Sequence, residues 1–239
     1  MRELCLVVSL SLVAAVMAFG QSPTKPRTHV TRVADGFDFP VAKPDGRGYK
    51  VYRGFIPGKH MGADMNAVKG RTGDPIYSVA HGLVLMARDA RGGWGNLVIV
   101  RHAYYANGRF NYVDSAYAHL ERITVREGQQ VVRGQQVGTL GSGGGRYAPH
   151  LHFEMRKNLN IGHDQRGHGK TFAHYFDPLD FIRRNRTLRR PVATAQVPVF
   201  TFPLPSKPGT AKVSAKKPTT KLTPQPTPRP TPRAFHPQR

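Results

Sequence analysis

Cysteine is almost absent from this chain. The one cysteine among 239 residues, Cys5, lies at the start of an apolar run near the N-terminus. A single thiol excludes an intramolecular disulfide and every cysteine-rich metal centre. A metal ion held by this chain must therefore be bound by histidine, aspartate or glutamate side chains.

Long apolar runs are equally scarce. Residues 4–19 form the only one, and it is shorter than the ~20 residues that a membrane-spanning helix needs. The run is typical of a secretory signal peptide, and Ala18-Phe19-Gly20 offers small residues for cleavage before Gln21. We therefore expect a signal peptide at residues 1–20, export to the periplasm or cell wall, and no membrane span in the mature chain. An uncleaved N-terminal anchor is the alternative, because one glutamate offsets the arginine that precedes the run.

Acidic residues are few, with 14 Asp and Glu against 36 Lys and Arg, a net charge of +22. None follows Asp180, whereas thirteen Lys and Arg residues lie between Arg183 and Arg239. Twelve of the twenty prolines follow Arg190. Such a composition cannot bury enough apolar surface to offset chain entropy, so we expect a disordered basic tail at 186–239.

The tail can serve as a tether to anionic polymers of the cell envelope or as a passive spacer. A nucleic-acid-binding function, suggested by the sequence pI of about 10.9, is disfavoured because the charge is concentrated in a tail without a recognisable nucleic-acid module. No nucleic-acid partner is therefore expected, and the sequence leaves the oligomeric state open.

A single globular domain remains at residues 36–185, preceded by a linker at 21–35. Long periodicity of 3.6 residues is absent, apart from a short helix expected near residues 178–184. Short segments rich in β-branched and aromatic residues are separated by glycine turns, which indicates an all-β domain with an antiparallel sheet and hairpins. The expected strands are Ile76–Ala80, Leu83–Ala87, Leu97–His102, Ser115–Leu120, Val131–Val132, Gln136–Leu140 and His150–Arg156.

The most informative segment is Pro149-His150-Leu151-His152-Phe153-Glu154. Alternate side chains of a strand face the same way, so His150 and His152 point to one face. An isolated pair of this kind also fits two half-buried strand histidines without a metal. The spacing alone does not decide which of the two histidines binds a metal.

Further candidate ligands lie in two distant segments. His60 and Asp64 are four residues apart, and His119 follows in Tyr117-Ala118-His119-Leu120. Catalytic zinc takes three protein ligands from imidazole nitrogen, carboxylate oxygen and thiolate, and leaves a position for water. The chain thus supplies the ligands for such a site and a general base beside it.

The order H-x-G-x-D, Y-x-H-L and P-H-L-H-F-E resembles the lysostaphin or LytM type of zinc metallopeptidase, which cuts the peptide part of bacterial peptidoglycan. The resemblance runs from about Phe55 to Ile182 and includes the intervening segments G-D-P-I-Y-S-V-A-H-G, G-G-W-G-N-L-V-I-V-R-H, V-x-x-G-Q-x-V and V-G-x-L-G. It implies a LytM-like fold of the duplicated hybrid motif type, whose sheet forms the floor of a substrate groove.

The same resemblance implies roles for five residues. It makes His60, Asp64 and His152 the zinc ligands, and His119 and His150 the catalytic histidines beside the metal. The implied activity is hydrolysis of peptidoglycan cross-links or stem peptides, with the scissile bond left open between glycyl-glycine and D-alanyl-diaminopimelate types. The rival hypothesis is a catalytically inactive relative that binds the cell wall and activates another hydrolase.

Other residues have weaker claims to a role. Tyr117 is expected on the strand face of His119, where it packs across strands or, as the alternative, orients that histidine or binds substrate. Asn96 is expected at a turn or strand end, with a place in the groove as the alternative, and Glu154 fits either a partner of an imidazole N–H or an exposed carboxylate. The glycine run of residues 141–145 lacks the lysine of a phosphate-binding loop, so a groove wall is expected there. His102 is expected to be structural, and Ser142 has no nucleophile motif around it. The segment Arg146-Tyr147-Ala148 is expected at the groove entrance, and residues 103–114 are expected to form a long hairpin loop. The extra segment at 159–175, which holds His163, His168 and His174, is expected to be a surface loop over one end of the cleft, with a second metal site as the alternative.

Overall fold

The computed structural model describes residues 27–163 and 168–199. The expected signal peptide lies outside the described residues, and so does most of the expected tail. None of the helices within the described ranges is long and apolar enough to cross a membrane. The elements are β1 (Arg27–Ala34), β2 (Tyr49–Arg53), β3 (Ala63–Ala67), β4 (Pro75–Tyr77), β5 (Gly82–Asp89), β6 (Asn96–Ala106), β7 (Arg109–Leu120), β8 (Arg122–Ile123), β9 (Gln130–Val131), β10 (Gln136–Thr139), β11 (Leu151–Arg156), β12 (Tyr175–Phe176), α1 (Pro178–Arg184) and β13 (Thr194–Val199).

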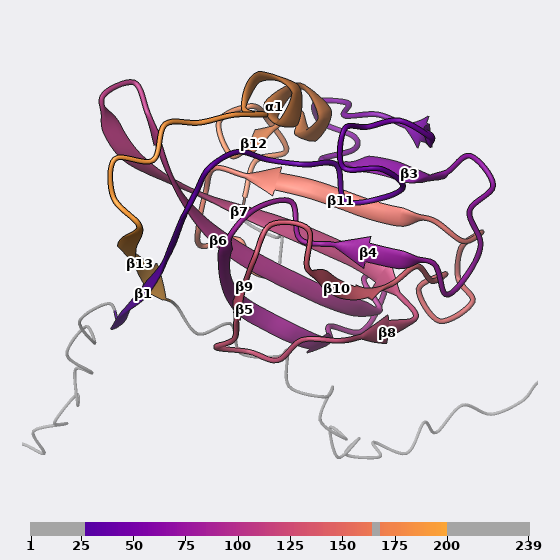
Figure 1. The fold of residues 1–239 in the computed structure, drawn as a ribbon. Helices are drawn as coiled ribbons and strands as arrows, with labels where there is room; N and C mark the ends of the chain where they lie inside the picture. Colours follow the sequence, from indigo (N-terminus) through magenta and orange to yellow (C-terminus); the bar gives the residue numbers. More distant parts are fainter. Residues whose placement is uncertain (1–26, 164–167, 200–239) are drawn as a thin grey trace, which may run out of the picture. The chain divides into compact units, whose positions relative to one another are not determined.

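The domain is nearly all β, as the sequence predicted. The larger sheet has the strand order β13-β1-β6-β7-β11-β3-β2, with β12 beside β11 and with β5 joining β6 to β9 (Figure 1). The smaller sheet has the order β4-β10-β8. Pairing is antiparallel except between β1 and β6, which run parallel, so the large sheet is mixed rather than purely antiparallel.

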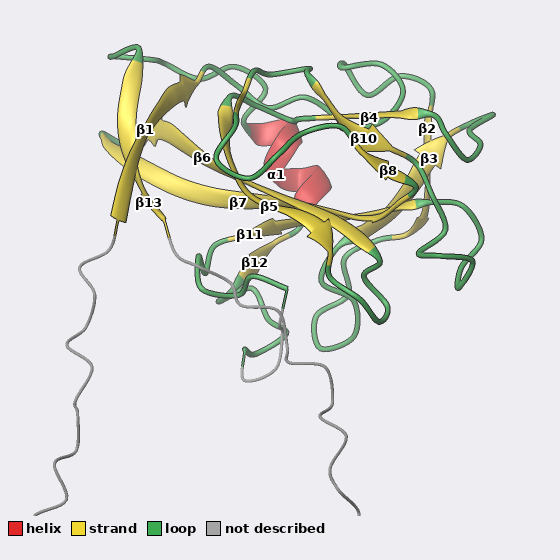
Figure 2. Ribbon diagram, turned by 90° about the horizontal axis from the view of Figure 1, so that it is seen from below, coloured by secondary structure: helices red, strands yellow, loops and turns green. Residues whose placement is uncertain are grey.

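The main core lies on one face of the large sheet. Strand residues Val100, Tyr117 and Phe153 are buried there against Ile76 of the small sheet and Phe181 of α1. The small sheet and α1 accordingly lie on the same side of the large sheet (Figure 2). The helix begins as the sequence predicts, because the Asp177 side chain accepts hydrogen bonds from the first backbone N–H groups. The opposite face of β7 and β11 is left to form the site described below.

Two segments expected to be unstructured form strands. Residues 27–34, part of the expected linker, pair with residues 194–199, which belonged to the expected tail. Val33 and Ala34 of β1 and Val197 of β13 are fully buried. The sequence prediction missed both strands because β1 is rich in polar residues, and β13 contains Pro198 and lies in a basic, proline-rich stretch of the chain. The described domain therefore extends beyond the expected limits of 36 and 185.

The expected hairpin loop at residues 103–114 is instead a continuation of two strands. Strands β6 and β7 stay paired until Ala106 and Arg109. Asn107 and Gly108 form the turn, both with positive φ (54° and 76°), as in a tight two-residue hairpin. The extra segment at 159–175 packs through Ile161 and Tyr175 onto Met61.

Candidate metal centre and groove

Three side chains from separate parts of the chain converge on the open face of the sheet. His60 precedes β3, Asp64 lies on β3, and His152 lies on β11 directly opposite Asp64. His60 Nε2 is 3.1 Å from both Asp64 Oδ1 and His152 Nδ1, and His152 Nδ1 is 2.8 Å from Asp64 Oδ1. The three residues to which the resemblance assigned the metal thus lie together.

The geometry and the donor atoms fit a zinc ion. Ligand atoms around a tetrahedral ion with bonds of about 2.0–2.1 Å lie about 3.3 Å apart, close to the separations seen here. Burial would raise the pKa of Asp64, but hydrogen bonds with His152 and His60 hold it below its ordinary value. Burial would lower the pKa of His152, but Asp64 and Glu154 raise it to about 9. The carboxylates of Asp64 and Glu154 therefore stabilise a positive charge at this cluster.

Both candidate imidazole ligands are oriented by a second hydrogen bond. His60 Nδ1 donates to the Gly54 carbonyl at 2.8 Å, which leaves Nε2 for the centre. His152 Nε2 donates to Glu154 Oε1 at 2.9 Å, which leaves Nδ1. Glu154 is fully buried and also accepts from Arg156 Nε at 2.6 Å. Glu154 is therefore a buried partner of the His152 N–H and not an exposed carboxylate.

The position of His119 depends on a β-bulge. Between the pairs Asn96–Leu120 and Val98–Tyr117, two residues of β7 lie opposite one residue of β6. His119 is in the bulge and has φ of 63°, a conformation that non-glycine residues rarely adopt. Tyr117 points into the core, where its hydroxyl accepts from the Val79 N–H at 2.9 Å. The expectation that Tyr117 and His119 share a face is therefore wrong, because the bulge breaks the alternation of the strand.

His119 and His150 lie side by side next to the three converging residues. Their ring centroids are 4.9 Å apart, and the His119 ring is 5.6 Å from that of His152. His119 Nδ1 donates to the Trp94 carbonyl at 3.3 Å, and His150 Nδ1 to the Ala148 carbonyl at 2.7 Å. Since a carbonyl can only accept, Nδ1 of each ring carries a proton, and Nε2 is the nitrogen left for the groove. Burial and the neighbouring His152 and His150 lower the pKa of His119 to about 4.

Two adjoining cavities form a groove across these residues. One, of about 370 Å³, is lined by Arg53, Trp94 and the histidines, and the other, of about 790 Å³, by Tyr52, Arg71 and residues 147–150. Asp64, His150 and Tyr147 line both cavities. The Tyr147 ring stacks on His119 with a centroid distance of 4.5 Å. The segment expected at the groove entrance therefore lies beside the candidate catalytic histidines.

The glycine run of residues 141–145 was expected to form a wall of the groove, but the cavities are lined by residues 147–150 instead, and Gly143 packs against Tyr147. Gly143 has φ of 62°, and a Cβ atom there would lie 2.9 Å from the Tyr147 ring, so this position requires glycine. Ser142 Oγ accepts from the Gly145 N–H at 3.0 Å, which places it within the loop rather than beside a base.

The other candidates have structural roles or remain outside the site. Asn96 donates to the Glu121 carbonyl at a strand end, and His102 is fully buried between the His81 carbonyl and Ser115 Oγ. Burial lowers the pKa of His102 to about 4. In the extra segment, His168 and His174 both contact the Asn158 amide, and within residues 27–163 and 168–199 only His60, Asp64 and His152 group as potential metal ligands. The second metal site is thus not found there.

Sequence reasoning overlooked two residues of the groove. The ring centroids of Trp94 and His152 are 5.8 Å apart, and the Arg156 guanidinium lies 5.5 Å from the centroid of the Trp94 ring. A lone tryptophan between glycines was the available signal. Arg53 had no signal, because an arginine at the end of a strand is ordinary.

Comparison with known proteins agrees with this geometry. Residues 58–164 match the model of peptidase family M23. A lipoprotein NlpD of Yersinia enterocolitica is 40% identical over 89 residues, which cover 37% of this chain and 84% of that protein. The chain belongs to peptidase family M23. The resemblance to lysostaphin- and LytM-type peptidases seen in the sequence is thereby confirmed.

Two further members of the family illustrate its range. The murein hydrolase activator NlpD of Escherichia coli (strain K12) is 39% identical over 103 residues, 43% of this chain and only 24% of that protein. The catalytic domain of the antimicrobial peptidase lysostaphin from Staphylococcus simulans is 26% identical, with a TM-score of 0.42 over 56% of this chain and 92% of that domain. The chain therefore spans about a quarter of the activator and most of the shorter lipoprotein.

Proposed function

We propose that this chain is a zinc-dependent endopeptidase that hydrolyses cross-link or stem peptides of bacterial peptidoglycan. The observation that carries the proposal is the convergence of His60, Asp64 and His152 with His119 and His150 beside them. Two imidazole nitrogens and one carboxylate oxygen form a donor set of catalytic zinc sites. Family membership supports a peptidase, and the groove supplies room for a peptide.

Zinc bound by these residues would polarise the peptide carbonyl and lower the pKa of a coordinated water from about 15.7 toward about 7. His119 and His150 lie side by side next to the ligand set, and each commits Nδ1 to a backbone carbonyl, which leaves Nε2 for proton transfer. One can accept the proton of the attacking water, and the other, once protonated, can donate to the leaving amine. Because the two histidines lie side by side, we assign the roles of general base and general acid to the pair and not to one residue each.

A second function is favoured by the names of the relatives. Murein hydrolase activators are about 39% identical to this chain, so an inactive wall-binding domain that activates another hydrolase is the rival proposal. The presence of all five site residues supports the enzyme. An activator needs the groove but needs neither a bound metal nor the two histidines beside it.

We further propose that the protein is exported and acts in the cell envelope. Relatives named as lipoproteins, including an outer membrane antigenic lipoprotein of Histophilus somni, support an envelope location. In this arrangement, residues 1–20 are a signal peptide, and the peptidase domain is followed by a basic tail. N-terminal sequencing of the exported protein would test the cleavage site.

The test of the enzyme separates ligands from catalytic histidines. Purified protein is expected to hold about one zinc ion per chain, and His60→Ala, Asp64→Ala and His152→Ala should each lose it because they remove a ligand. His119→Ala and His150→Ala should keep zinc and lose roughly 10²- to 10⁴-fold in turnover. Elemental analysis measures the zinc, and mass spectrometry of fragments released from purified walls measures cleavage.

Two outcomes would contradict the proposal. Full zinc in a His60, Asp64 or His152 variant would remove that residue from the ligand set, and loss of zinc in His150→Ala would mean that the two histidines of β11 and its preceding loop are assigned wrongly. Zinc-loaded protein that releases no fragments from walls, but accelerates a second purified wall hydrolase, would establish the activator instead.

A further inference from the structure

The groove has an unusual charge balance. Asp64 is the only carboxylate among the residues that line either cavity, and it belongs to the candidate metal centre. The other charged groups are two guanidinium groups, Arg53 in the cavity with Trp94 and Arg71 in the cavity with Tyr52. A bound divalent cation would add further positive charge. The groove is therefore built to receive an anion.

Arg53 is fixed close to the centre by its backbone. It is the last residue of β2 and lies opposite Asp64 of β3 in the register of the sheet. The next residue, Gly54, accepts the hydrogen bond from His60 Nδ1. The side chain is exposed, and among the described residues no hydrogen bond or ion pair of its guanidinium is found. Arg53 lines the cavity, and its guanidinium offers five N–H donors to an anion there.

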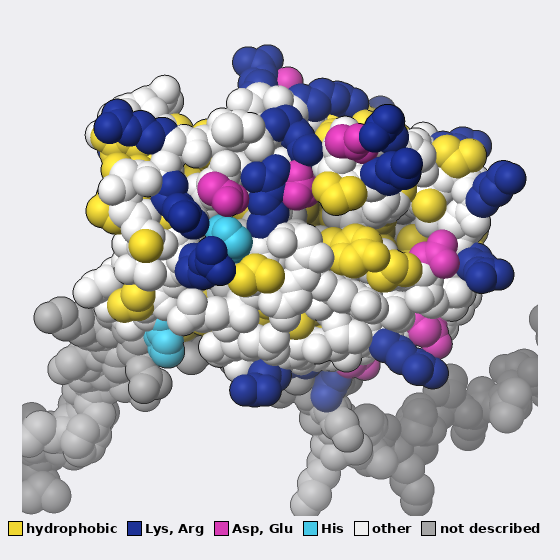
Figure 3. All heavy atoms as spheres, viewed as in Figure 1, with side chains coloured by type: hydrophobic (Ala, Val, Ile, Leu, Met, Phe, Trp, Pro, Cys, Tyr) yellow, Lys and Arg dark blue, Asp and Glu magenta, His cyan; other side chains and the backbone are white. Residues whose placement is uncertain are grey.

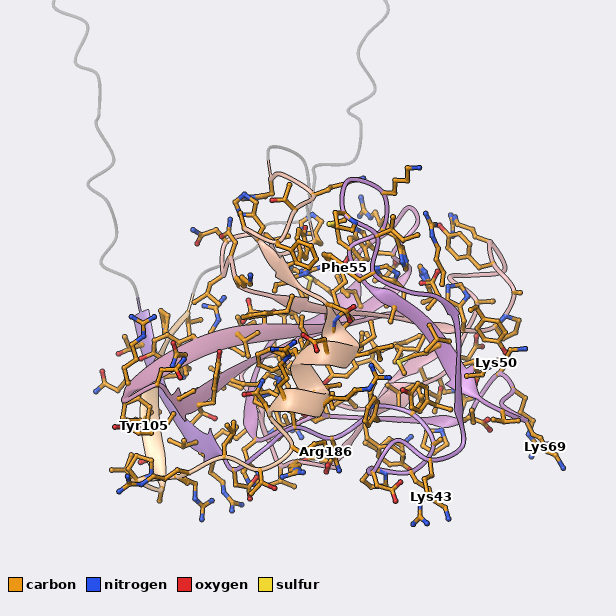
Figure 4. All side chains as sticks on the ribbon, turned by 90° about the horizontal axis from the view of Figure 1, so that it is seen from above. Lys43, Lys50, Phe55, Lys69, Tyr105 and Arg186 are labelled. Atoms are coloured by element: carbon orange, nitrogen blue, oxygen red, sulfur yellow. The ribbon has the colours of Figure 1, made fainter. Side chains whose placement is uncertain are left out.

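Arg71 is less available. Its backbone N–H donates to Asp74 Oδ2 at 2.9 Å, and its Nε lies 3.9 Å from Asp74 Oδ1. This carboxylate partly offsets its charge. Lys50 and Lys69 lie on one side of the domain in Figure 4, and the Lys50 ammonium lies 5.2 Å from the ring centroid of Tyr52, which lines the cavity of Arg71. Lysine and arginine are also widespread on the face of the molecule shown in Figure 3, so position in the cavity, rather than charge alone, distinguishes Arg53.

We propose that Arg53 binds a carboxylate of the substrate, so that the groove selects peptides with a free carboxylate next to the scissile bond over neutral glycine bridges. A guanidinium pairs with a carboxylate through two parallel hydrogen bonds, which neither a glycine bridge nor an amidated peptide can reproduce. The inference rests on the proposed function, because it concerns the substrate of the same site. Of the two types of scissile bond left open by the sequence, the inference selects the diaminopimelate cross-link, in which a free carboxylate lies beside the cleaved amide.

The test uses two soluble cross-linked peptides that differ in one group. One carries the free diaminopimelate carboxylate and the other carries its amide, which has nearly the same size. Trp94 is the only tryptophan of the chain and lines the cavity of Arg53, so its fluorescence reports binding without any need for turnover. The zinc-loaded protein should bind the carboxylate peptide about 10-fold more tightly, the effect of one charge-assisted hydrogen-bonded pair.

Arg53→Gln should abolish this preference while leaving the affinity for the amidated peptide unchanged. Arg109→Gln, an exposed arginine at the far hairpin, is the matched control and should keep the preference. Equal affinity of the unmodified protein for both peptides, no binding of either, or an undiminished preference in Arg53→Gln would each overturn the inference. Selective binding without cleavage would leave the Arg53 inference in place and remove the proposed enzyme function.

Discussion

At the scale of single residues, the four histidines of the groove share one arrangement. In each of them, one ring nitrogen donates a hydrogen bond to a carbonyl or carboxylate oxygen, and the other nitrogen is left for the candidate metal centre or the groove. The donating nitrogen is Nδ1 in three of them and Nε2 in His152. Because the outer acceptor fixes both the proton and the ring, the cluster is organised before any substrate arrives.

Glu154 is the acceptor whose role is easiest to test. Its carboxylate orients His152, and the Arg156 guanidinium lowers the pKa of Glu154 to about 2 although burial opposes this. Glu154→Gln keeps the shape and loses the charge, so the affinity for zinc should fall by about 10- to 100-fold. Competition with a fluorescent zinc chelator measures this affinity. Glu121→Gln, at an exposed residue, is the control, and equal affinities in all three proteins would exclude the role.

The five residues that the structure brings together were picked out through the resemblance of their motifs to a known family, and their individual roles stay a prediction. Sequence reasoning could not reach the direction of His119, which depends on a register shift between two strands and on a positive φ. Nor could it choose between a buried and an exposed Glu154, since that depends on its contacts with Arg156 and His152 in the folded sheet. Residue types are local information, whereas direction and burial come from pairing across the sheet.

At the scale of elements, strands were predicted where apolar residues are dense. The β5, β6, β7 and β11 predictions succeeded for this reason, although β6 and β7 proved longer than expected. Strand β3 was missed, because Ala63-Asp64-Met65-Asn66-Ala67 has no β-branched residue. Its strand conformation comes from its neighbours β2 and β11 rather than from its own propensity. The strand that carries Asp64, a proposed metal ligand, is therefore defined by pairing with its neighbours.

The β6–β7 turn offers a test of the hairpin alone. Gly108 has φ of 76°, and a Cβ atom there would meet no other atom within 4 Å, so Gly108→Ala should destabilise only through backbone strain. The expected loss is about 1–2 kcal/mol in the free energy of unfolding, measured by denaturant titration. Asn107→Gly at the neighbouring left-handed position should cost much less. Equal losses in both variants would contradict the turn geometry, and zinc content should be unchanged in either.

At the scale of the whole molecule, the limits of the folded domain decide how the basic tail can be studied. A cut after Arg190, which composition alone suggests, would remove β13 together with its pairing to β1. It would also remove the Pro198 carbonyl that accepts from buried Arg101 Nη1. Arg101 further binds Asp114 through two hydrogen bonds of 2.7 Å and donates to the Leu159 carbonyl. A cut after Val199 preserves all these contacts and is the appropriate design.

Residues 200–239 contain eight Lys and Arg residues and no Asp or Glu, so their removal tests a polyelectrolyte effect separately from the fold. If this segment tethers the protein to anionic envelope polymers, the chain ending at Val199 should cleave a small soluble peptide at the full rate but co-sediment less with isolated walls at low salt. The difference should vanish at high salt, because the Debye length falls from about 10 Å at 0.1 M to about 3 Å at 1 M. A full-length variant with these eight residues changed to glutamine is the matched control and should behave like the truncated chain. Equal sedimentation of the three proteins across the salt range would show that the tail is a spacer, since charge is the only property that the glutamine variant lacks.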